Sequence, residues 1–336
     1  LAARERLAAA TGLFGAEARE VVGELRVCDI GVPGRLVEEV GRSALLADEA
    51  LCARWLLPRS PSAHKAQSGR VLVVAGGPGH VGAAVLAARG ALRAGAGLVT
   101  VVTWPESAEQ LAAALPEAMT LTLDADGSLP RELPSLLSQA HALAIGPGLG
   151  VEERARRALV SLMELGRCPM VLDADALTLS AHHRLLPRTA LSQRGLVLTP
   201  HAGEAARLLG VSAAQVQADR WESLRHLVEL SEGCVLFKGP HTLVGEPGAL
   251  PLISDRGTPA LATGGTGDVL TGVLAALLVH HPPSRAALLA AHLHGLAAEL
   301  WRADHGVDRG LLASEVAERI PDAIALVAAR RHGLPD

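Results

Sequence analysis

The chain has 336 residues, of which 49% are hydrophobic, which is enough for one large core or for two unequal domains. Its net charge is −4 and it carries no basic block, so a nucleic-acid partner is not expected. Aromatic residues make up only 2% of the chain, which also argues against stacking platforms for single-stranded nucleic acid. No stretch reaches the roughly 18 uninterrupted apolar residues of a membrane span, so no membrane partner is expected.

The spacing of the cysteines bears on the cellular compartment in which the chain is expected. All four are far apart in the sequence and none belongs to a CxxC pair: Cys28, Cys52, Cys168 and Cys234. This spacing argues against a zinc ribbon or a disulfide scaffold and favours a cytoplasmic location.

The first 69 residues differ in pattern from the rest. Within residues 1–55, the stretch GELRVCDIGVP (23–33) predicts one strand and a turn. The stretch LLPRSPSAHKAQSG (56–69), with two prolines and several small polar residues, is typical of a linker. We therefore expect the main domain to cover residues 70–330.

From residue 70 onward, short apolar runs alternate with Ala- and Leu-rich helical stretches. Strands are predicted at residues 70–77, 98–103, 142–148, 170–175, 195–201 and 234–239, and helices between them at 83–94, 151–165 and 203–210. Nearly continuous apolar strands that alternate with helices indicate an α/β fold with a mostly parallel central sheet and helices on both faces. Residues 242–255 then predict a β-hairpin, an apolar run behind Asp268 predicts a buried helix, and residues 284–301 and 313–329 predict two covering helices.

The polar residues of this domain follow the strands. The strands end in GGPGH, GPGLG, DAD, TPH and KGPHT. Ligands of open α/β sheets bind at the carboxyl ends of the strands, so five such ends with different chemistry predict one site.

The glycines of GGPGHVG match the dinucleotide fingerprint GxGxxG, but the acidic residue expected at the end of the second strand is missing. That strand ends at Thr103, and the first acid, Glu106, lies beyond Pro105. A glycine turn that serves packing alone stays open as an alternative. The chain has neither a P-loop nor HExxH, and His292 and His294 are expected to be helix-face residues rather than metal ligands.

Asp173 and Asp175 lie two apart at a strand end, so both side chains could face the same way. A pair that caps a loop and a catalytic pair both remain open.

Lys238 and Asp268 suggest phosphoryl transfer. Lys238 ends an apolar strand, where a charge is costly unless it meets an anion or reaches water. Four small residues lead into Asp268, in GGTGD at a predicted helix start, and such a start binds phosphate. A carboxylate beside a phosphate site makes sense as a base that activates a substrate hydroxyl, with a plain helix N-cap as the alternative.

These motifs jointly resemble the ADP-dependent NAD(P)H-hydrate dehydratases of the ribokinase-like superfamily. GRVLVVAGG, AIGPGLG, VLDADAL, LTPHAGEAARLLG, KGPHT and ATGGTGDVLTG occur in the order of that family, over residues 65–325 or so. The resemblance implies a ribokinase-like three-layer αβα fold and ADP-dependent dehydration of the S-epimer of NADHX or NADPHX to NAD(P)H, with AMP and phosphate as further products. Residues 23–33 resemble the closing segment of an NAD(P)H-hydrate epimerase domain. Residues 1–55 would be its remnant, with the body of that domain upstream of Leu1, and we expect no epimerase activity.

The resemblance also implies a role for each site residue. Asp268 would be catalytic and would face the substrate, NAD(P)H hydrate, whose pocket would be lined by Ala83, Gly148 and His201. Glu204 would organise Mg²⁺ through water. The adenine nucleotide, ADP or AMP, would be held by Lys238, Gly239, Pro240, His241, Thr242, Thr263, Gly264, Gly265, Thr266 and Gly267.

Two residues depart from the family pattern: His80 stands where a Tyr is common and Ala84 where a Pro is common, which affects the fine shape of the substrate pocket. The resemblance further suggests a homotetramer.

Two other functions stay open: a ribokinase-like kinase of a small alcohol, of the hydroxymethylpyrimidine or pyridoxal type, and a non-catalytic nucleotide-binding module. We expect about the first 20 residues to be poorly packed, and the dehydratase to fold without residues 1–55.

Overall fold

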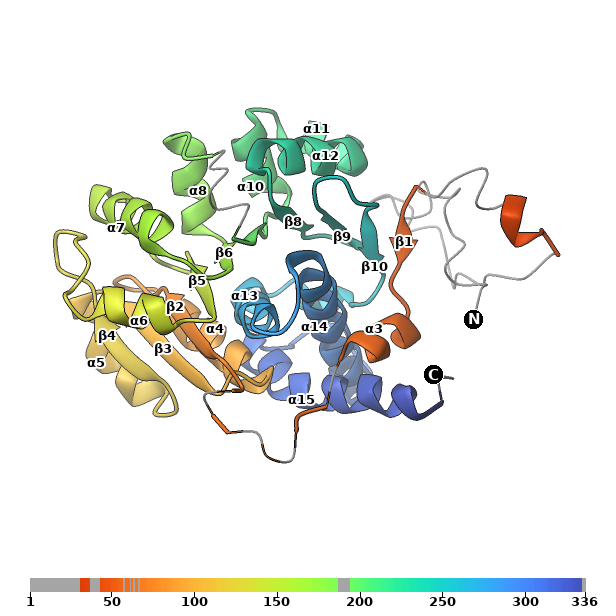
Figure 1. Cartoon of the computed structure of the whole chain (residues 1–336), viewed down its shortest axis with the longest axis horizontal. Helices are drawn as coiled ribbons and strands as arrows, with labels where there is room; N and C mark the ends of the chain where they lie inside the picture. The colour runs from red at the N-terminus through yellow and green to blue at the C-terminus, as the bar shows by residue number, and fades with distance from the viewer. Residues whose placement is uncertain are drawn as a thin grey trace.

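The computed structural model describes residues 31–36, 43–56, 58–60, 62, 64–65, 67–186 and 194–333 (Figure 1). The strand and turn expected at residues 23–33 lie largely outside the described residues, as do the first 20 residues whose packing was predicted.

The described strands form one ten-stranded sheet in the order β1-β10-β9-β8-β7-β6-β5-β2-β3-β4. Their bounds are β1 Leu45–Leu46, β2 Arg70–Val74, β3 Leu98–Thr103, β4 Met119–Thr122, β5 Ala142–Ile145, β6 Met170–Leu172, β7 Leu196–Leu198, β8 Cys234–Phe237, β9 Thr242–Gly245 and β10 Leu252–Ser254.

The sheet is parallel except for β9, which pairs antiparallel with both β8 and β10. The six strands predicted after residue 70 and the hairpin at 242–255 are present; β3 has the predicted bounds, and the other strands are shorter than their predicted ranges. Strands β1 and β4 were not predicted, because β1 has only two residues and β4 is a partly exposed edge strand with two threonines.

Helices cover both faces of the sheet (Figure 1). Residues alternate along each strand: Val71 and Val73 pack on one face, while Leu72 and Val74 pack on the other. The first face is covered by α3 Glu49–Trp55, α4 Val81–Arg93, α5 Pro105–Ala114, α13 Thr266–Leu278, α14 Pro283–His305 and α15 Ala313–Ala329. The second face is covered by α6 Leu133–Gln139, α7 Glu153–Leu165, α8 Asp175–His182, α10 Ala202–Leu209, α11 Ala213–Ala218 and α12 Arg220–Ser231. The three-layer α/β fold is thus confirmed.

Residues 43–56 are part of the same folded unit. Strand β1 pairs in parallel with β10, and Cys52 and Ala53 of α3 are fully buried in the core. Helix α3 also contacts α14, α15 and the short 3₁₀ helix η4 Arg330–Gly333. Whether residues 1–55 are an epimerase remnant, 56–69 a linker and 70–330 the dehydratase domain stays a prediction. A deletion of residues 1–55 would remove an edge strand and a covering helix of this sheet.

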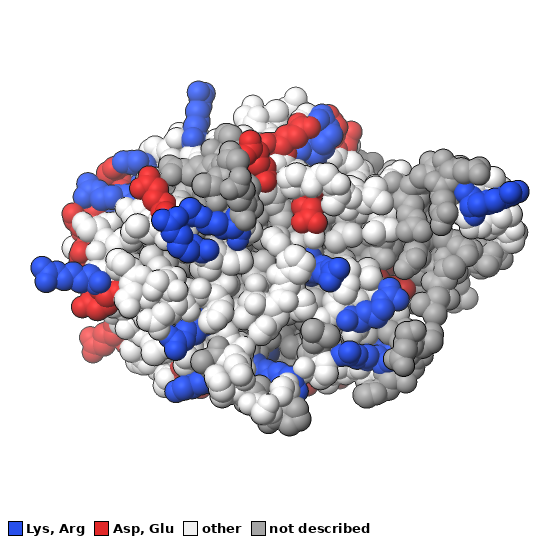
Figure 2. Space-filling view, in the orientation of Figure 1, with Lys and Arg blue, Asp and Glu red and all other residues white. Residues whose placement is uncertain are grey.

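On the face drawn in Figure 2, Lys and Arg side chains are mixed with Asp and Glu side chains at the left and at the top, while the lower part shows mainly Lys and Arg. None of the helices in the described part of the chain is both long and apolar enough to cross a membrane.

Candidate active site

The carboxyl ends of β6 and β8 bring Asp173 and Lys238 together. The Lys238 ammonium group donates a hydrogen bond to Asp173 Oδ1 at 2.8 Å, and Thr271 Oγ1 of α13 donates to Oδ2 at 2.5 Å. Burial alone would raise the pKa of Asp173, but the charge and hydrogen bond of Lys238 outweigh it and lower that pKa. Burial would likewise lower the pKa of Lys238, but Asp173 and Glu204 raise it. Both groups are therefore charged, and Lys238 is held in place.

Asp268 lies in the first turn of α13, one helical turn before Thr271. Burial raises its pKa to about 7, the negative charge of Asp173 adds to that rise, and Lys238 opposes it. A carboxylate with this pKa can take up a proton near neutral pH, as a general base must.

The glycine-rich loop before α13 brings backbone close to Lys238. Gly265 caps the helix with φ +90°, a left-handed conformation in which a side chain is strained. A Cβ at Gly267 would lie 3.7 Å from Lys238 Nζ. The positive end of a 13-residue helix and an ammonium group therefore face the same space, which favours an anion there.

Helices α4 and α13 pack unusually close. A Cβ at Gly90 would lie 2.4 Å from the Val269 carbonyl oxygen, and one at Gly272 would lie 1.8 Å from the Ala87 carbonyl oxygen. Only glycine permits this approach, so the small residues of these two helices hold their N-terminal ends, with Ala83 and Asp268, along the same edge of the sheet.

The loops after β2 and β5 meet at Gly148. A Cβ at Gly148 would lie 2.6 Å from His80 Cβ and 3.2 Å from Ala83 Cβ. The Gly150 N–H donates to Asp175 Oδ2 at 2.8 Å, which ties this loop to the start of α8. The predicted substrate residues Ala83 and Gly148 are thus neighbours, together with His80, one of the two departures from the family pattern. Asp175 here has the loop-bracing role that the sequence left open.

His201 and Glu204 form a capping box at the start of α10. The His201 N–H donates to Glu204 Oε2 at 2.8 Å, and His201 Nδ1 accepts from the Gly203 N–H at 2.9 Å. Because Nδ1 accepts, the neutral ring carries its proton on Nε2, and burial lowers the pKa of His201. Glu204 Oε2 also lies 3.6 Å from Lys238 Nζ, so the capping box belongs to the same charged cluster.

A cavity of about 440 Å³ opens beside this cluster, between the β8–β9 loop, the loop after β10 and the start of α13. Six of the ten predicted nucleotide residues line it, namely Lys238, Gly239, Pro240, Thr242, Thr266 and Gly267. The other four, His241, Thr263, Gly264 and Gly265, belong to the same two loops without lining the cavity.

Sequence reasoning missed the opposite wall of the cavity, which includes Arg256, Gly257, Thr258, His294 and Gly295. The nearest signal was His294, which the sequence reading placed on a helix face. His294 Nε2 lies 2.9 Å from the Thr266 carbonyl oxygen, and burial lowers its pKa to about 4, so the ring is neutral and donates to Thr266. His292 is fully buried, and neither of its ring nitrogens has a hydrogen-bond partner among the described residues.

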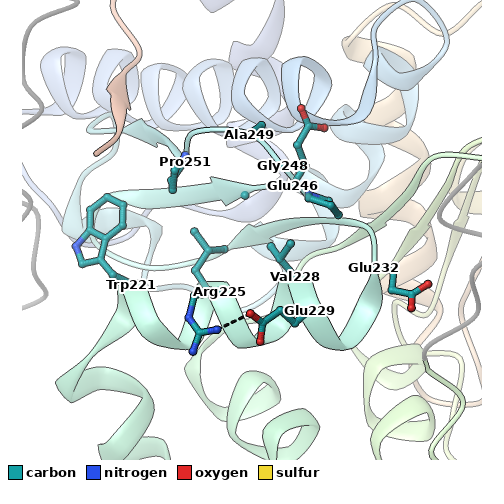
Figure 3. Close-up of a pocket in the computed structure, with 12 residues that line it drawn as sticks. Trp221, Arg225, Val228, Glu229, Glu232, Glu246, Gly248, Ala249 and Pro251 are labelled. Carbon is teal, nitrogen blue, oxygen red and sulfur yellow. Dashed lines mark hydrogen bonds and ion pairs between the residues drawn. The ribbon is translucent and has the colours of Figure 1, made fainter. Parts of the chain in front are cut away.

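A second cavity, of about 490 Å³, lies between α12 and the β9–β10 hairpin (Figure 3). Its wall is mainly apolar, with Trp221, Val228 and Pro251 among the lining residues and an Arg225–Glu229 ion pair at its edge. None of the predicted site residues lines it.

Comparisons with known proteins bear on this site. The chain is 39% identical over 307 residues to the bifunctional NAD(P)H-hydrate repair enzyme Nnr of Escherichia coli (strain K12). The aligned region is 91% of this chain and 57% of that protein. It is 34% identical over 341 residues to the bifunctional NAD(P)H-hydrate repair enzyme of Leishmania infantum, and here the aligned region is 92% of this chain and 59% of that protein. The chain thus spans less than two thirds of the length of these relatives.

Solved structures share the fold. An ADP/ATP-dependent NAD(P)H-hydrate dehydratase from Bacillus subtilis, co-crystallised with ATP and Mg²⁺, superposes with a TM-score of 0.73 and 31% identity over 84% of this chain and 99% of that one. A ribokinase-like superfamily protein from Enterococcus faecalis superposes with a TM-score of 0.74 and 25% identity over 84% of this chain and 96% of that one. The ribokinase-like fold that the motifs implied is therefore confirmed.

The sequence model of the NAD(P)H-hydrate dehydratases matches residues 71–322, a range that holds the charged cluster and the cavity beside it. This chain therefore belongs to the NAD(P)H-hydrate dehydratase family.

Proposed function

We propose that this chain dehydrates the S-epimer of NAD(P)H hydrate to NAD(P)H at the expense of ADP, releasing AMP and phosphate. The observation that carries the proposal is the arrangement of Asp268, a carboxylate with a pKa of about 7, beside the fixed ammonium group of Lys238 at a helix N-terminus.

The adenine nucleotide would occupy the cavity of about 440 Å³. Its phosphates would lie at the end where Lys238 and Gly267 meet, because the ammonium group and the N-terminus of α13 both favour negative charge. The apolar part of the wall, with Leu261, Leu270 and Ala291, suits the face of the base. His241, Thr263, Gly264 and Gly265 would shape the two loops that hold the nucleotide.

The hydrate would lie on the other side of Asp268, against Ala83, Gly148 and His201. Asp268 takes the proton of the hydroxyl on the hydrated ring while that oxygen attacks the terminal phosphorus of ADP, and AMP leaves. Lys238 and the N–H groups of α13 balance the charge that develops on the transferred group. The lone pair of the ring nitrogen then expels phosphate, and loss of a proton from the adjacent carbon restores the double bond of NAD(P)H.

Magnesium fits the residues of this site. Mg²⁺ keeps several waters and is commonly held by one or two carboxylates together with substrate phosphates. Glu204 Oε2 is engaged by the His201 N–H, while Oε1 has its His201 contact only at 3.6 Å and can accept from a metal-bound water. Glu204 would hold the ion through a bound water, and the ion would supply positive charge to the phosphates.

A ribokinase-like kinase of a small alcohol would use the same base and would keep the phosphate on its product. The family match and the 31% identical dehydratase structure favour dehydration. The resemblance to a hydroxyethylthiazole kinase from Pyrococcus horikoshii, at 19% identity and a TM-score of 0.51, concerns the fold alone.

The homotetramer and the cytoplasmic location also stay proposals. Light scattering tests the first, and a mass near 34.7 kDa would contradict it.

The catalytic proposal is tested by incubating the chain with epimerically pure NADHX and ADP, with ATP in place of ADP, or with no nucleotide. We expect the absorbance of NADH to return with the S-epimer and a nucleotide, and AMP and phosphate to form in equal amounts when ADP is used. A stable phosphorylated product without NADH would instead support the kinase.

A further inference from the structure

Arg256 lines the cavity opposite Lys238 and is held by two carboxylates from different helices. Its guanidinium group donates to Glu299 Oε2 of α14 at 2.8 Å and to Glu49 Oε1 of α3. Glu49 Oε2 in turn accepts from Arg330 at 2.8 Å. The side chains of Arg256, Glu49 and Glu299 are each about a quarter exposed, so water screens these ion pairs less than it would at a fully open surface.

The backbone beside Arg256 is fastened as well. The Gly257 N–H donates to Glu299 Oε1 at 2.7 Å, so a single carboxylate holds both the side chain and the main chain of the wall. A Cβ at Gly295 would lie 2.6 Å from the Arg256 carbonyl carbon, so the wall rests directly on the backbone of α14. Residues 256–258 therefore have little freedom while these contacts last.

The sheet explains why α3 reaches this wall. Strands β1 and β10 are parallel neighbours, so their carboxyl ends lie at the same edge, the edge that carries the site. Glu49 lies three residues after β1 and Arg256 two residues after β10. Helix α3 lies outside the range matched by the family model, residues 71–322.

The two carboxylates stabilise the charged guanidinium group of Arg256. Burial would lower its pKa, but Glu299 and Glu49 raise it. Without Glu49, the guanidinium group would lose one of the two carboxylates to which it donates and could turn further into the cavity, where it would compete with Lys238 for the phosphates and leave the wall less fixed.

We propose that Glu49 of α3, together with Glu299, is a positioning residue for the nucleotide site: the two carboxylates hold the Arg256–Thr258 wall in the shape that binds the adenine nucleotide. This inference rests on the proposed function, because it takes the cavity to be the nucleotide site. Helix α3 would then contribute to nucleotide binding through Glu49.

The test compares Glu49→Gln and Glu299→Gln with Glu318→Gln. Glu318 of α15 pairs with Arg93 on the surface and does not line the cavity, so it is the matched control for loss of an ion pair. For each variant we would measure kcat, the KM values of ADP and of the hydrate, and the ADP Kd by calorimetry, with the melting temperature in the absence of nucleotide. Glu49→Asp tests partial rescue.

We expect the KM and Kd of ADP to rise about three- to tenfold in Glu49→Gln and in Glu299→Gln, with kcat and the KM of the hydrate within about twofold of the unaltered chain. Glu318→Gln should change none of them. The proposal is overturned if ADP affinity is unchanged in the first two variants, or if kcat and the melting temperature fall together with the loss of ADP affinity.

Should Glu49→Gln fail to fold, Arg256→Lys replaces it, since an ammonium group keeps the charge but cannot bridge two carboxylates in the same way. The same rise in the KM of ADP supports the proposal, and its absence overturns it. If the unaltered chain binds no ADP, the proposed function itself fails. Normal ADP binding that is insensitive to Glu49 and Glu299 refutes only this inference.

Discussion

Asp173 and Asp268 lie in one site, and burial pushes the pKa of both carboxyl groups upward, yet they end in opposite states. At the end of β6, Lys238 and Thr271 donate to the two oxygens of Asp173, and its pKa falls. At the start of α13, Asp268 has no such pair of donors among the described residues, and the charge of Asp173 raises its pKa further, to about 7. Burial therefore does not explain the difference between the two pKa values. The direct partners do: they keep Asp173 ionised beside Lys238, while Asp268, which lacks them, can carry a proton near neutral pH.

The largest expected effect comes from Asp268→Asn. The amide keeps the size and the hydrogen-bonding capacity of the side chain but cannot accept the hydroxyl proton, so we expect kcat to fall by about 10²- to 10⁴-fold with ADP affinity largely intact. Steady-state kinetics and calorimetry measure the two quantities. A variant that keeps a near-normal rate would show that Asp268 is not the base.

The next largest effect is expected from Lys238→Ala, which removes the phosphate partner and leaves the buried Asp173 carboxylate without its cationic partner. The ADP Kd should rise about 10- to 100-fold, since a charge-assisted contact in a partly buried site is lost. Lys65→Ala, at the other, exposed lysine of the chain, is the control. Equal ADP affinity in the two variants would contradict the phosphate role of Lys238.

The pH profile sharpens the comparison. Because Asp268 must be ionised to act as a base, kcat/KM should rise with pH through a midpoint of about 7. Asp173→Asn removes a negative neighbour, so we expect the midpoint to move to lower pH. An unmoved midpoint would mean that Asp173 does not influence Asp268.

The smallest effect concerns stability. Between the unfolded pKa near 4 and the folded pKa of about 7, the folded chain binds more protons at Asp268 than the unfolded chain does, so stability falls as pH rises through that window. Asp268→Asn escapes this cost. Urea unfolding should therefore find the variant more stable at pH 8, on the order of 1–3 kcal/mol, and the gain should vanish at pH 4. A gain of equal size at both pH values would assign it to another cause.

The sequence was most informative where a charged residue occurs at a position that usually disfavours charge. A lysine at the end of a buried strand and a carboxylate after four small residues pointed to the site, and the structure brings Lys238 and Gly267 of those two motifs together. Asp173 could not be assigned, because its partner Lys238 is 65 residues away and only the sheet order brings them into contact.

The opposite wall of the cavity, which includes Arg256, could not be recognised from the sequence in this way. Arg256 and Glu49 are ordinary surface residue types, 207 positions apart, and they meet only because β1 adds to the sheet beside β10. A strand of two residues cannot be recognised from periodicity, so neither β1 nor the contact that it makes possible could be predicted.

The most direct test of the contrast between the two carboxylates is a carbon-13 NMR titration of the chain labelled at its aspartate carboxyl groups, with Asp268→Asn and Asp173→Asn used to assign the two resonances. We predict that the Asp268 signal titrates with a midpoint of about 7 and that the Asp173 signal shows no transition above its ordinary range. An Asp268 signal that titrates near pH 4 would contradict the assignment of this residue as the base.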